Sequence, residues 1–175
     1  MDEFVGNVTP AAGSGTDEEI LNRRKMRYNC AQAVLLAFAE DAGLEKDVNR
    51  IVARTEKEIK AGSIVTVGER VLKHAVAGFG GGIGRTHDEG TCGALTGAVA
   101  GLGILLYADD ERTSELAREL FLHFKKELGT LQCARLKSPE QRVSCIQCCL
   151  VAGRKLREII ERESQRRDEN PQSEE

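Results

Sequence analysis

Glycine recurs every fourth residue in the most apolar part of the chain, at Gly93, Gly97 and Gly101. Residues four apart lie near one face of an α-helix, where each glycine costs about 1 kcal/mol relative to alanine. Three glycines in register therefore indicate that another backbone approaches this face closely. Only 4% of the residues are aromatic and none is Trp, so alanine, leucine and glycine must fill the core. We therefore predict an all-α fold, a compact bundle of five to seven close-packed helices.

Capping signals mark where the first helices begin. Thr16, followed three residues later by Glu19, has the capping-box pattern and predicts a helix from Thr16 to Arg27. Asn29 is a second candidate N-cap, so this region forms either one long helix or two helices kinked near Tyr28 and Asn29. Further helices are predicted over 45–60, 69–79 and 91–107, and a short extended piece over 63–67. Another helix should run from Asp109 or Asp110 to Leu128, where Gly129 terminates it. The last helix should begin at Ser138, with Pro139 at its first position, and end at Glu163.

The composition indicates one folded domain. We divide the chain into a flexible N-terminal arm over 1–15, a single helical domain over 16–163 and a polar C-terminal tail over 164–175. The net charge of −3 excludes a strong field that would attract nucleic acid or anionic lipid. The acidic N-terminus lacks the apolar segment of a signal peptide, and residues 93–107 are too short and too rich in glycine for a membrane span. We therefore expect a cytoplasmic protein without nucleic-acid or membrane partners; the sequence is compatible with a homodimer.

Six cysteines carry the functional signal: Cys30, Cys92, Cys133, Cys145, Cys148 and Cys149. In a reducing compartment such cysteines seldom form a disulfide framework; they usually bind metal, carry electrons or exchange disulfides. Cys30 follows Asn29 and Cys92 follows Thr91, so both are predicted in the first turn of a helix, where a thiolate is favoured. Cys133 and Cys145 belong to two further elements, so four cysteines can converge on one point of a compact bundle.

A glycine-rich loop runs toward Cys92. Gly80, Gly81 and Gly82 have no side chains, so their backbone could wrap an inorganic cluster and donate N–H groups to its sulfur atoms. We therefore predict the loop at the cysteine site. The chain contains no G-x-x-x-x-G-K-[ST] pattern and no G-x-G-x-x-G after a convincing strand, which argues against a nucleotide-binding loop.

The cysteine contexts together resemble the C_GCAxxG_C_C family of small redox-active proteins over residues 17–160. The matching segments are Asn29-Cys30-Ala31-Gln32-Ala33-Val34, Phe79-Gly80-Gly81-Gly82, Cys92-Gly93-Ala94-Leu95-Thr96-Gly97, Phe124 to Gly129 before Cys133, and Cys145 on the final helix. The resemblance implies four signature cysteines, which map onto Cys30, Cys92, Cys133 and Cys145. A related module in split-Soret cytochromes accompanies an iron–sulfur centre. This chain has no C-x-x-C-H motif, so a haem is not implied, and Cys148 and Cys149 are additions to the family pattern.

Three functions and one plain alternative stay open at this point. In the first, the four signature cysteines bind an iron–sulfur cluster, [2Fe–2S] in our prediction, and pass single electrons to a redox partner protein. In the second, a metal-free thiol–disulfide oxidoreductase or redox sensor uses Cys92 as nucleophile, with Cys30 or Cys133 as its resolving partner. In the third, zinc stabilises a structural or interaction module. The plain alternative is that the cysteines are buried small hydrophobic side chains.

Three residues beside the signature cysteines have two readings each. Cys148 and Cys149 follow Cys145 by three and four residues, so both can lie near its face of the helix. They are predicted either to pack the helix or, as the alternative, to serve as a spare ligand or resolving thiol. His87 is either a solvated loop residue or an accessory ligand or proton donor.

Overall fold

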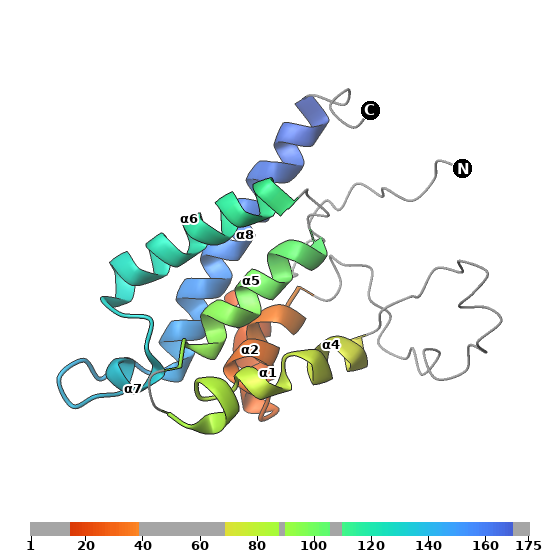
Figure 1. The fold of residues 1–175 in the computed structure, drawn as a ribbon. Coiled ribbons are helices and arrows are strands. Elements are labelled where there is room, and N and C mark those ends of the chain that lie inside the picture. Colours follow the sequence, from red (N-terminus) through yellow and green to blue (C-terminus); the bar gives the residue numbers. More distant parts are fainter. Residues whose placement is uncertain (1–14, 39–68, 88–89, 106–109, 170–175) are drawn as a thin grey trace.

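The computed structural model describes residues 15–38, 69–87, 90–105 and 110–169 (Figure 1). In these ranges the α-helices are α1 (Asp17–Lys25), α2 (Cys30–Leu36), α4 (Glu69–Ala75), α5 (Gly93–Leu105), α6 (Asp110–Leu128), α7 (Cys133–Leu136) and α8 (Cys145–Glu169), and the 3-10 helices are η2 (Ala77–Phe79) and η3 (Ile83–Arg85). The described residues form no β-strand, only an isolated bridge between Thr91 and Gln132. The predicted all-α bundle is confirmed. The elements predicted over 45–60 and 63–67 lie outside the described residues.

Helix α2 is the centre of the bundle. All seven of its residues are buried, and it packs against α1, α4, α5 and α8 (Figure 1). Helices α5, α6 and α8 pack against one another and enclose the larger core cluster, which includes Leu102, Leu120, Phe124 and Leu156. None of the helices in the described ranges combines the length and the apolar character needed to cross a lipid bilayer.

The first two helices are separate, and each begins at its predicted cap. The Thr16 side chain accepts a hydrogen bond of 3.1 Å from the Glu19 N–H. The Asn29 side chain accepts one of 2.9 Å from the Gln32 N–H, and Gln32 completes the capping box. Between the helices Arg27 has a φ of 64°, which an α-helix cannot accommodate, so helical structure is interrupted there. Of the two predicted alternatives, the structure therefore adopts two helices.

The predicted close approach of another backbone is found at Gly93 and Gly97, and at Gly97 that backbone belongs to α2. A β-carbon at Gly97 would stand 2.6 Å from the Cα of Ala31. One at Gly93 would overlap the carbonyl oxygen of Phe79 at the end of η2. Side chains at these positions would push whole backbones apart, so glycine is required by the close approach of three segments.

The last helix begins later than predicted, at Cys145 rather than at Ser138. Its effective cap is Ser144, whose hydroxyl accepts a hydrogen bond of 3.0 Å from the Gln147 N–H. The Ser138–Pro139 signal instead belongs to a turn that Arg142 closes with its N–H on the Ser138 carbonyl and its side chain on the Pro139 carbonyl. Helix α8 also continues to Glu169, beyond the predicted end at Glu163.

The start of α5 also differs by one position. We expected Thr91 to cap this helix with Cys92 in its first turn. Cys92 itself stands directly before Gly93, the first helical residue, and its carbonyl accepts the N–H groups of Leu95 and Thr96. Thr91, the residue before it, forms the isolated bridge with Gln132.

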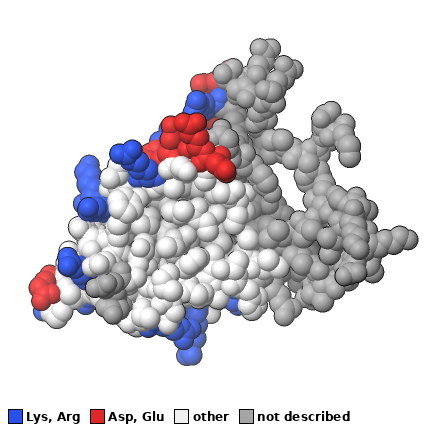
Figure 2. Space-filling model, viewed as in Figure 1, with Lys and Arg blue, Asp and Glu red and all other residues white. Residues whose placement is uncertain are grey.

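Charged side chains gather along α6 and α8. Figure 2 shows them at the upper edge of a face that is otherwise largely uncharged among the described residues. Glu119 of α6 forms salt bridges with Arg162 (2.7 Å) and Lys155 (2.8 Å) of α8. Glu163 of α8 forms one with Arg112 of α6 (2.5 Å). The two helices are thus joined by a network of alternating charges beyond their apolar contact.

This network should make the protein sensitive to acid. Hydrogen bonding from Arg162, helped by Lys155 and opposed by burial, lowers the pKa of Glu119 from 4.5 to about 2. A carboxyl group with a depressed folded-state pKa stabilises the fold above its unfolded pKa and loses that contribution as pH falls toward the folded value. We expect the Tm to fall between pH 5 and pH 2, and to fall less in Glu119→Gln. The Tm difference between wild type and variant should be largest near neutral pH and vanish near pH 2; a difference independent of pH would contradict this assignment.

Candidate functional site

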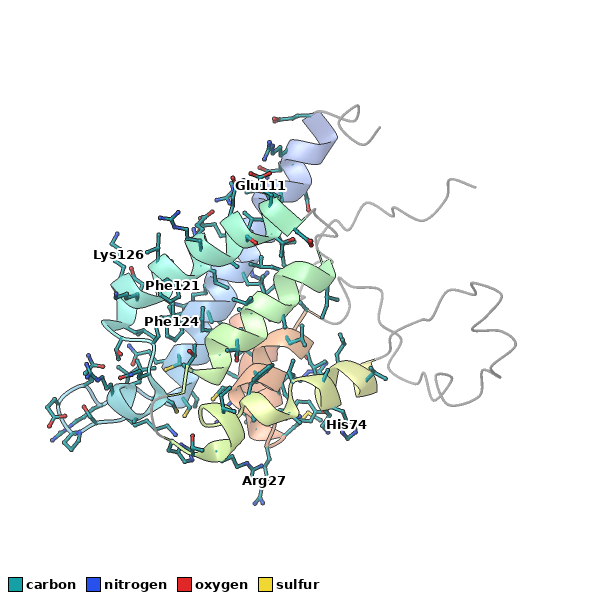
Figure 3. The ribbon with its side chains drawn as sticks, viewed as in Figure 1. Arg27, His74, Glu111, Phe121, Phe124 and Lys126 are labelled. Carbon is teal, nitrogen blue, oxygen red and sulfur yellow. The ribbon has the colours of Figure 1, made fainter. Side chains whose placement is uncertain are left out.

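Four of the six cysteines stand at the starts of four helices. Cys30, Cys133 and Cys145 are the first residues of α2, α7 and α8, and Cys92 directly precedes α5. Figure 3 shows sulfur atoms, in yellow, at the end of the bundle where α7 lies. Cys145 is partly exposed and the other five cysteines are buried. The structure therefore gathers the predicted residues at one end of the core.

The position of Cys30 follows from the residues around it. Asn29 caps α2 and also donates its side-chain N–H to the Ala77 carbonyl at 3.0 Å. Gln32 completes the capping box and donates its side-chain N–H to the Lys73 carbonyl at 2.8 Å. The side chains of Asn29 and Gln32 therefore begin α2 and bind it to α4 and η2. Because Cys30 stands between these two residues in the sequence, they fix its position.

Cys92 and Cys133 are fixed relative to each other by a short antiparallel contact. The Cys92 N–H donates to the Leu131 carbonyl at 2.8 Å, and the Cys133 N–H donates to the Gly90 carbonyl at 3.0 Å. The Thr91–Gln132 bridge lies between these two bonds. Main-chain hydrogen bonds thus set the spacing of two cysteines that are 41 residues apart in the sequence.

The glycine loop lies over the same region. A β-carbon at Gly80 would stand 2.8 Å from the Asn29 β-carbon, and one at Gly82 would stand 3.6 Å from the β-carbon of Cys133. Gly81 and Gly82 have φ values of 65° and 77°, a region that favours glycine. The loop therefore packs against Asn29, the neighbour of Cys30, and against Cys133 itself. Its contact with a cofactor stays a prediction.

The cysteines interact in two groups. Cys92 and Cys148 shift each other's pKa, so their thiols lie near each other. Cys30 interacts in the same way with Cys145 and Cys149, and the Cys149 thiol donates to the Cys30 carbonyl at 3.8 Å. Sequence reasoning paired Cys92 with Cys30 or Cys133 and missed Cys148 as its contact. No spacing within the last helix could have found this pair, because it depends on how α5 and α8 pack.

The two groups differ in which sulfur carries negative charge most easily. The Cys148 hydrogen bond lowers the pKa of Cys92 against the effect of burial, and the N–H groups of Ala94 and Leu95 lower it further. The same contact raises the pKa of Cys148. Within this pair, then, Cys92 is the thiol that ionises first.

The pKa of Cys30 is raised, whereas its place at a helix start led us to expect a lowered one. Its hydrogen bond from Cys145 favours the thiolate, but the contact with Cys149 together with burial outweighs it and raises the pKa of Cys30 to about 12. The contact with Cys30, together with burial, likewise raises the pKa of Cys145. Cys30 and Cys145 are therefore protonated thiols in the metal-free protein.

Lys137 and His87 form the exposed rim of the site. The Lys137 ammonium stands 3.3 Å from Nδ1 of His87 and hydrogen-bonds to Cys145. Nδ1 of His87 is also 4.0 Å from the sulfur of Cys133. Burial alone would lower the pKa of Lys137, but the sulfur atoms of Cys145 and Cys133 outweigh it and raise that pKa. The sequence left the role of His87 open, and the structure places its ring at the cysteine site.

An apolar groove runs beside the site. It has a volume of about 650 Å³ and lies between η2, α5 and α6, with Phe79, Leu95 and Phe121 among its lining residues. Figure 3 labels Phe121 on α6, and Phe124 one turn further along is fully buried. Thr91, directly before Cys92, and Leu95, three residues after it, both line the groove. The protein surface next to Cys92 is therefore apolar.

The donor set fits an iron–sulfur cluster in kind and in number. Such clusters are held by four cysteine thiolates, and the four signature positions supply four. The described residues contain no group of three or more His, Cys, Asp or Glu side chains already arranged around a point where one metal ion would sit. The sulfur atoms contact one another instead, so cluster binding would replace thiol–thiol hydrogen bonds with iron–thiolate bonds.

Comparison with known protein families gives a match. The family model described as "Putative redox-active protein (C_GCAxxG_C_C)" matches residues 60–159, more than half of the chain. Cys92, Cys133, Cys145 and the pair Cys148–Cys149 lie inside the matched range, whereas Cys30 precedes it. No curated protein and no solved structure matches the chain.

Proposed function

Since the chain belongs to the C_GCAxxG_C_C family of redox-active proteins, we propose that it is an electron-transfer protein in which Cys30, Cys92, Cys133 and Cys145 bind an iron–sulfur cluster. The observation that carries the proposal is that each of these cysteines stands at the start of its own helix or directly before it, and that three of the four are buried. Cys145 links the set, because it hydrogen-bonds to Cys30 and lies close enough to Cys92 and Cys133 to affect the pKa of both.

The cluster would supply the electron chemistry, accepting and releasing one electron at a time. The protein's own residues would hold it and set its surroundings. The N–H groups of Ala94 and Leu95 reach the Cys92 sulfur, and hydrogen bonds to such sulfurs tune the reduction potential. Burial of Cys30, Cys92 and Cys133 keeps water away from three of the four ligands.

Positive charge near the ligands supports the same assignment. Four thiolates in one place repel each other unless positive groups offset their charge. The Lys137 ammonium hydrogen-bonds to Cys145, and the N-terminal ends of the long helices α5 and α8 point at Cys92 and Cys145. Removing the ammonium in Lys137→Met should therefore lower the reduction potential of the centre, since the oxidised and reduced states differ by one negative charge.

Spectroscopy of protein purified without oxygen tests the proposal. We expect visible absorption that bleaches on addition of dithionite, and an electron paramagnetic resonance signal in one of the two redox states. Cys133→Ser should lose both signals. The matched control is Ser144→Ala, which removes a helix cap beside the site but no sulfur, and should keep both. Protein that is colourless when prepared without oxygen would overturn the proposal.

The contact between Cys145 and Cys30 favours a second function, thiol–disulfide exchange without metal. Cys145 is the partly exposed cysteine, so a partner's disulfide can reach it, and Cys30 lies beside it as the resolving thiol. Because the attacking species is the thiolate and the pKa of Cys145 is raised, we expect this exchange to be slow at neutral pH and to become faster as pH rises. The expected result is a loss of two titratable thiols per oxidation cycle in metal-free wild type, which Cys30→Ser abolishes. An unchanged thiol count after exposure to a disulfide substrate would remove this candidate.

A further inference from the structure

The apolar groove beside the cysteine site has a single charged side chain among its described lining residues, that of Arg118 on α6. We propose that the groove binds an apolar carboxylate, whose hydrocarbon part lies between α5 and α6 and whose carboxylate group pairs with the Arg118 guanidinium. The lining includes Thr91, the residue before Cys92, but among the described residues it includes no cysteine. The inference therefore stands without the proposed function.

The groove has the size and the lining of a small-molecule site. Such sites are concave and mostly apolar, with a few polar groups and a volume of about 300–1,000 Å³. This groove has a volume of about 650 Å³. Of its nine described lining residues, six are apolar, two are threonines and one is Arg118. A ligand that matches this lining is mainly hydrocarbon and carries one polar group.

Aromatic residues are scarce in this chain, and two of them line the groove. The whole sequence has five Phe, two Tyr and no Trp. Phe38 and Phe124 are buried in the core, whereas Phe121 is 39% exposed and Phe79 is partly buried. Apolar surface left in water costs free energy, and exposed apolar patches mark ligand-binding grooves. The placement of Phe79 and Phe121 in one groove therefore indicates a binding surface for an apolar ligand.

Arg118 determines the charge that the ligand should carry. Its side chain is exposed, and it has no carboxylate partner among the described residues. By contrast, Arg112 forms a salt bridge with Glu163, and Arg162 forms one with Glu119. A guanidinium group binds a carboxylate through two parallel N–H···O bonds. Since no acidic residue is among the described lining residues, a carboxylate ligand is favoured over a cationic one.

The two helices place the apolar and the charged parts of the groove next to each other. Arg118 and Phe121 are three residues apart on α6, so their side chains are neighbours on one helix face. Leu95 and Val99 are four residues apart on α5, which packs against α6 (Figure 1). A hydrocarbon chain between these two helix faces therefore places its carboxylate group at Arg118.

Calorimetric titration of the full chain with octanoate, below its micelle concentration, tests the site. We expect saturable binding with one octanoate per chain. Octanol has the same chain length and no charge, so it should bind roughly fivefold more weakly, the effect of losing a solvent-exposed ion pair. Absence of saturable octanoate binding, or equal affinity for octanoate and octanol, would overturn the proposal.

Two pairs of variants locate the ligand. Arg118→Gln should weaken octanoate binding roughly fivefold and leave octanol binding unchanged. Its control is Lys125→Gln, which removes an exposed cation of α6 outside the groove and should change neither. Phe121→Ala should weaken binding of both ligands about tenfold, because each loses apolar contact with the ring. Its control is Leu122→Ala, which removes an exposed apolar side chain outside the groove and should change neither.

The remaining outcomes are decisive as well. Equal effects within either pair of variants would place octanoate elsewhere on the protein and overturn the proposal. Light scattering examines a second copy of the chain as the occupant: a dimer that Phe121→Ala converts to monomers, with no octanoate binding by the wild type, would assign the groove to a dimer interface instead. Circular dichroism checks that each variant is folded, and Arg118→Gln, at an exposed position, keeps the test valid if Phe121→Ala unfolds. Octanoate binding requires no metal, so iron content decides the proposed function separately.

Discussion

Replacing Gly97 by leucine should destabilise the protein by about 3 kcal/mol, the upper end of what overpacking of a core costs. A β-carbon at this position would stand 2.6 Å from the Cα of Ala31 in α2, so a backbone and not merely a side chain has to move. For a chain of this size the loss corresponds to a decrease in Tm of about 6–12 °C. Thermal unfolding followed by circular dichroism measures it.

Gly103 provides a matched control on the same helix. A β-carbon there meets nothing within 4 Å. Gly103→Leu should leave the Tm unchanged or raise it slightly, because leucine has a higher helix propensity than glycine. Equal effects of the two substitutions would mean that α2 and α5 are not in close contact, and would remove the reason for the glycine pattern.

Replacing Cys145 by serine should abolish iron binding. Cys145 hydrogen-bonds to Cys30 and lies near enough to Cys92 and Cys133 to influence both, so its loss affects the whole ligand set. We expect the variant to retain less than about a tenth of the wild-type iron, at least the cost of losing an outer-shell partner. Iron is measured by elemental analysis of protein purified without oxygen.

The control for this variant is Cys149→Ala. Cys149 is fully buried and belongs to the same thiol group, but it is not a proposed ligand. Alanine is a small apolar replacement, so the variant should fold and keep most of its iron. Equal iron loss in both variants would show that the cysteine core as a whole is needed for folding, and that Cys145 has no special role as a ligand.

Features with a local physical cause were predictable from the sequence. The caps at Thr16 and Asn29 depend on side chains three residues apart, and both are found as expected. The glycine spacing correctly predicted a helix face that meets another backbone. Cys30 and Cys92 were predicted at helix starts, whereas Cys133 was expected in a connection and Cys145 inside a helix that began at Ser138; the structure places Cys133 and Cys145 at helix starts as well.

Features that depend on competition between neighbours were not predictable. Ser138 and Ser144 both offer a cap for α8, and only the turn closed by Arg142 decides in favour of Ser144. The contact between Cys92 and Cys148 depends on how α5 and α8 pack, which no spacing within one helix reveals. The raised pKa of Cys30 has the same origin, because Cys149 and burial outweigh the effect expected from a helix start.

The amount of iron and acid-labile sulfide bound per chain decides whether the cysteine site holds a cluster. For protein purified without oxygen, we expect two irons and two sulfides per chain if the cluster is [2Fe–2S], both lost from Cys145→Ser. Zinc bound at one ion per chain without sulfide, or six free thiols with neither metal, would contradict the claim that this cysteine site binds an iron–sulfur cluster.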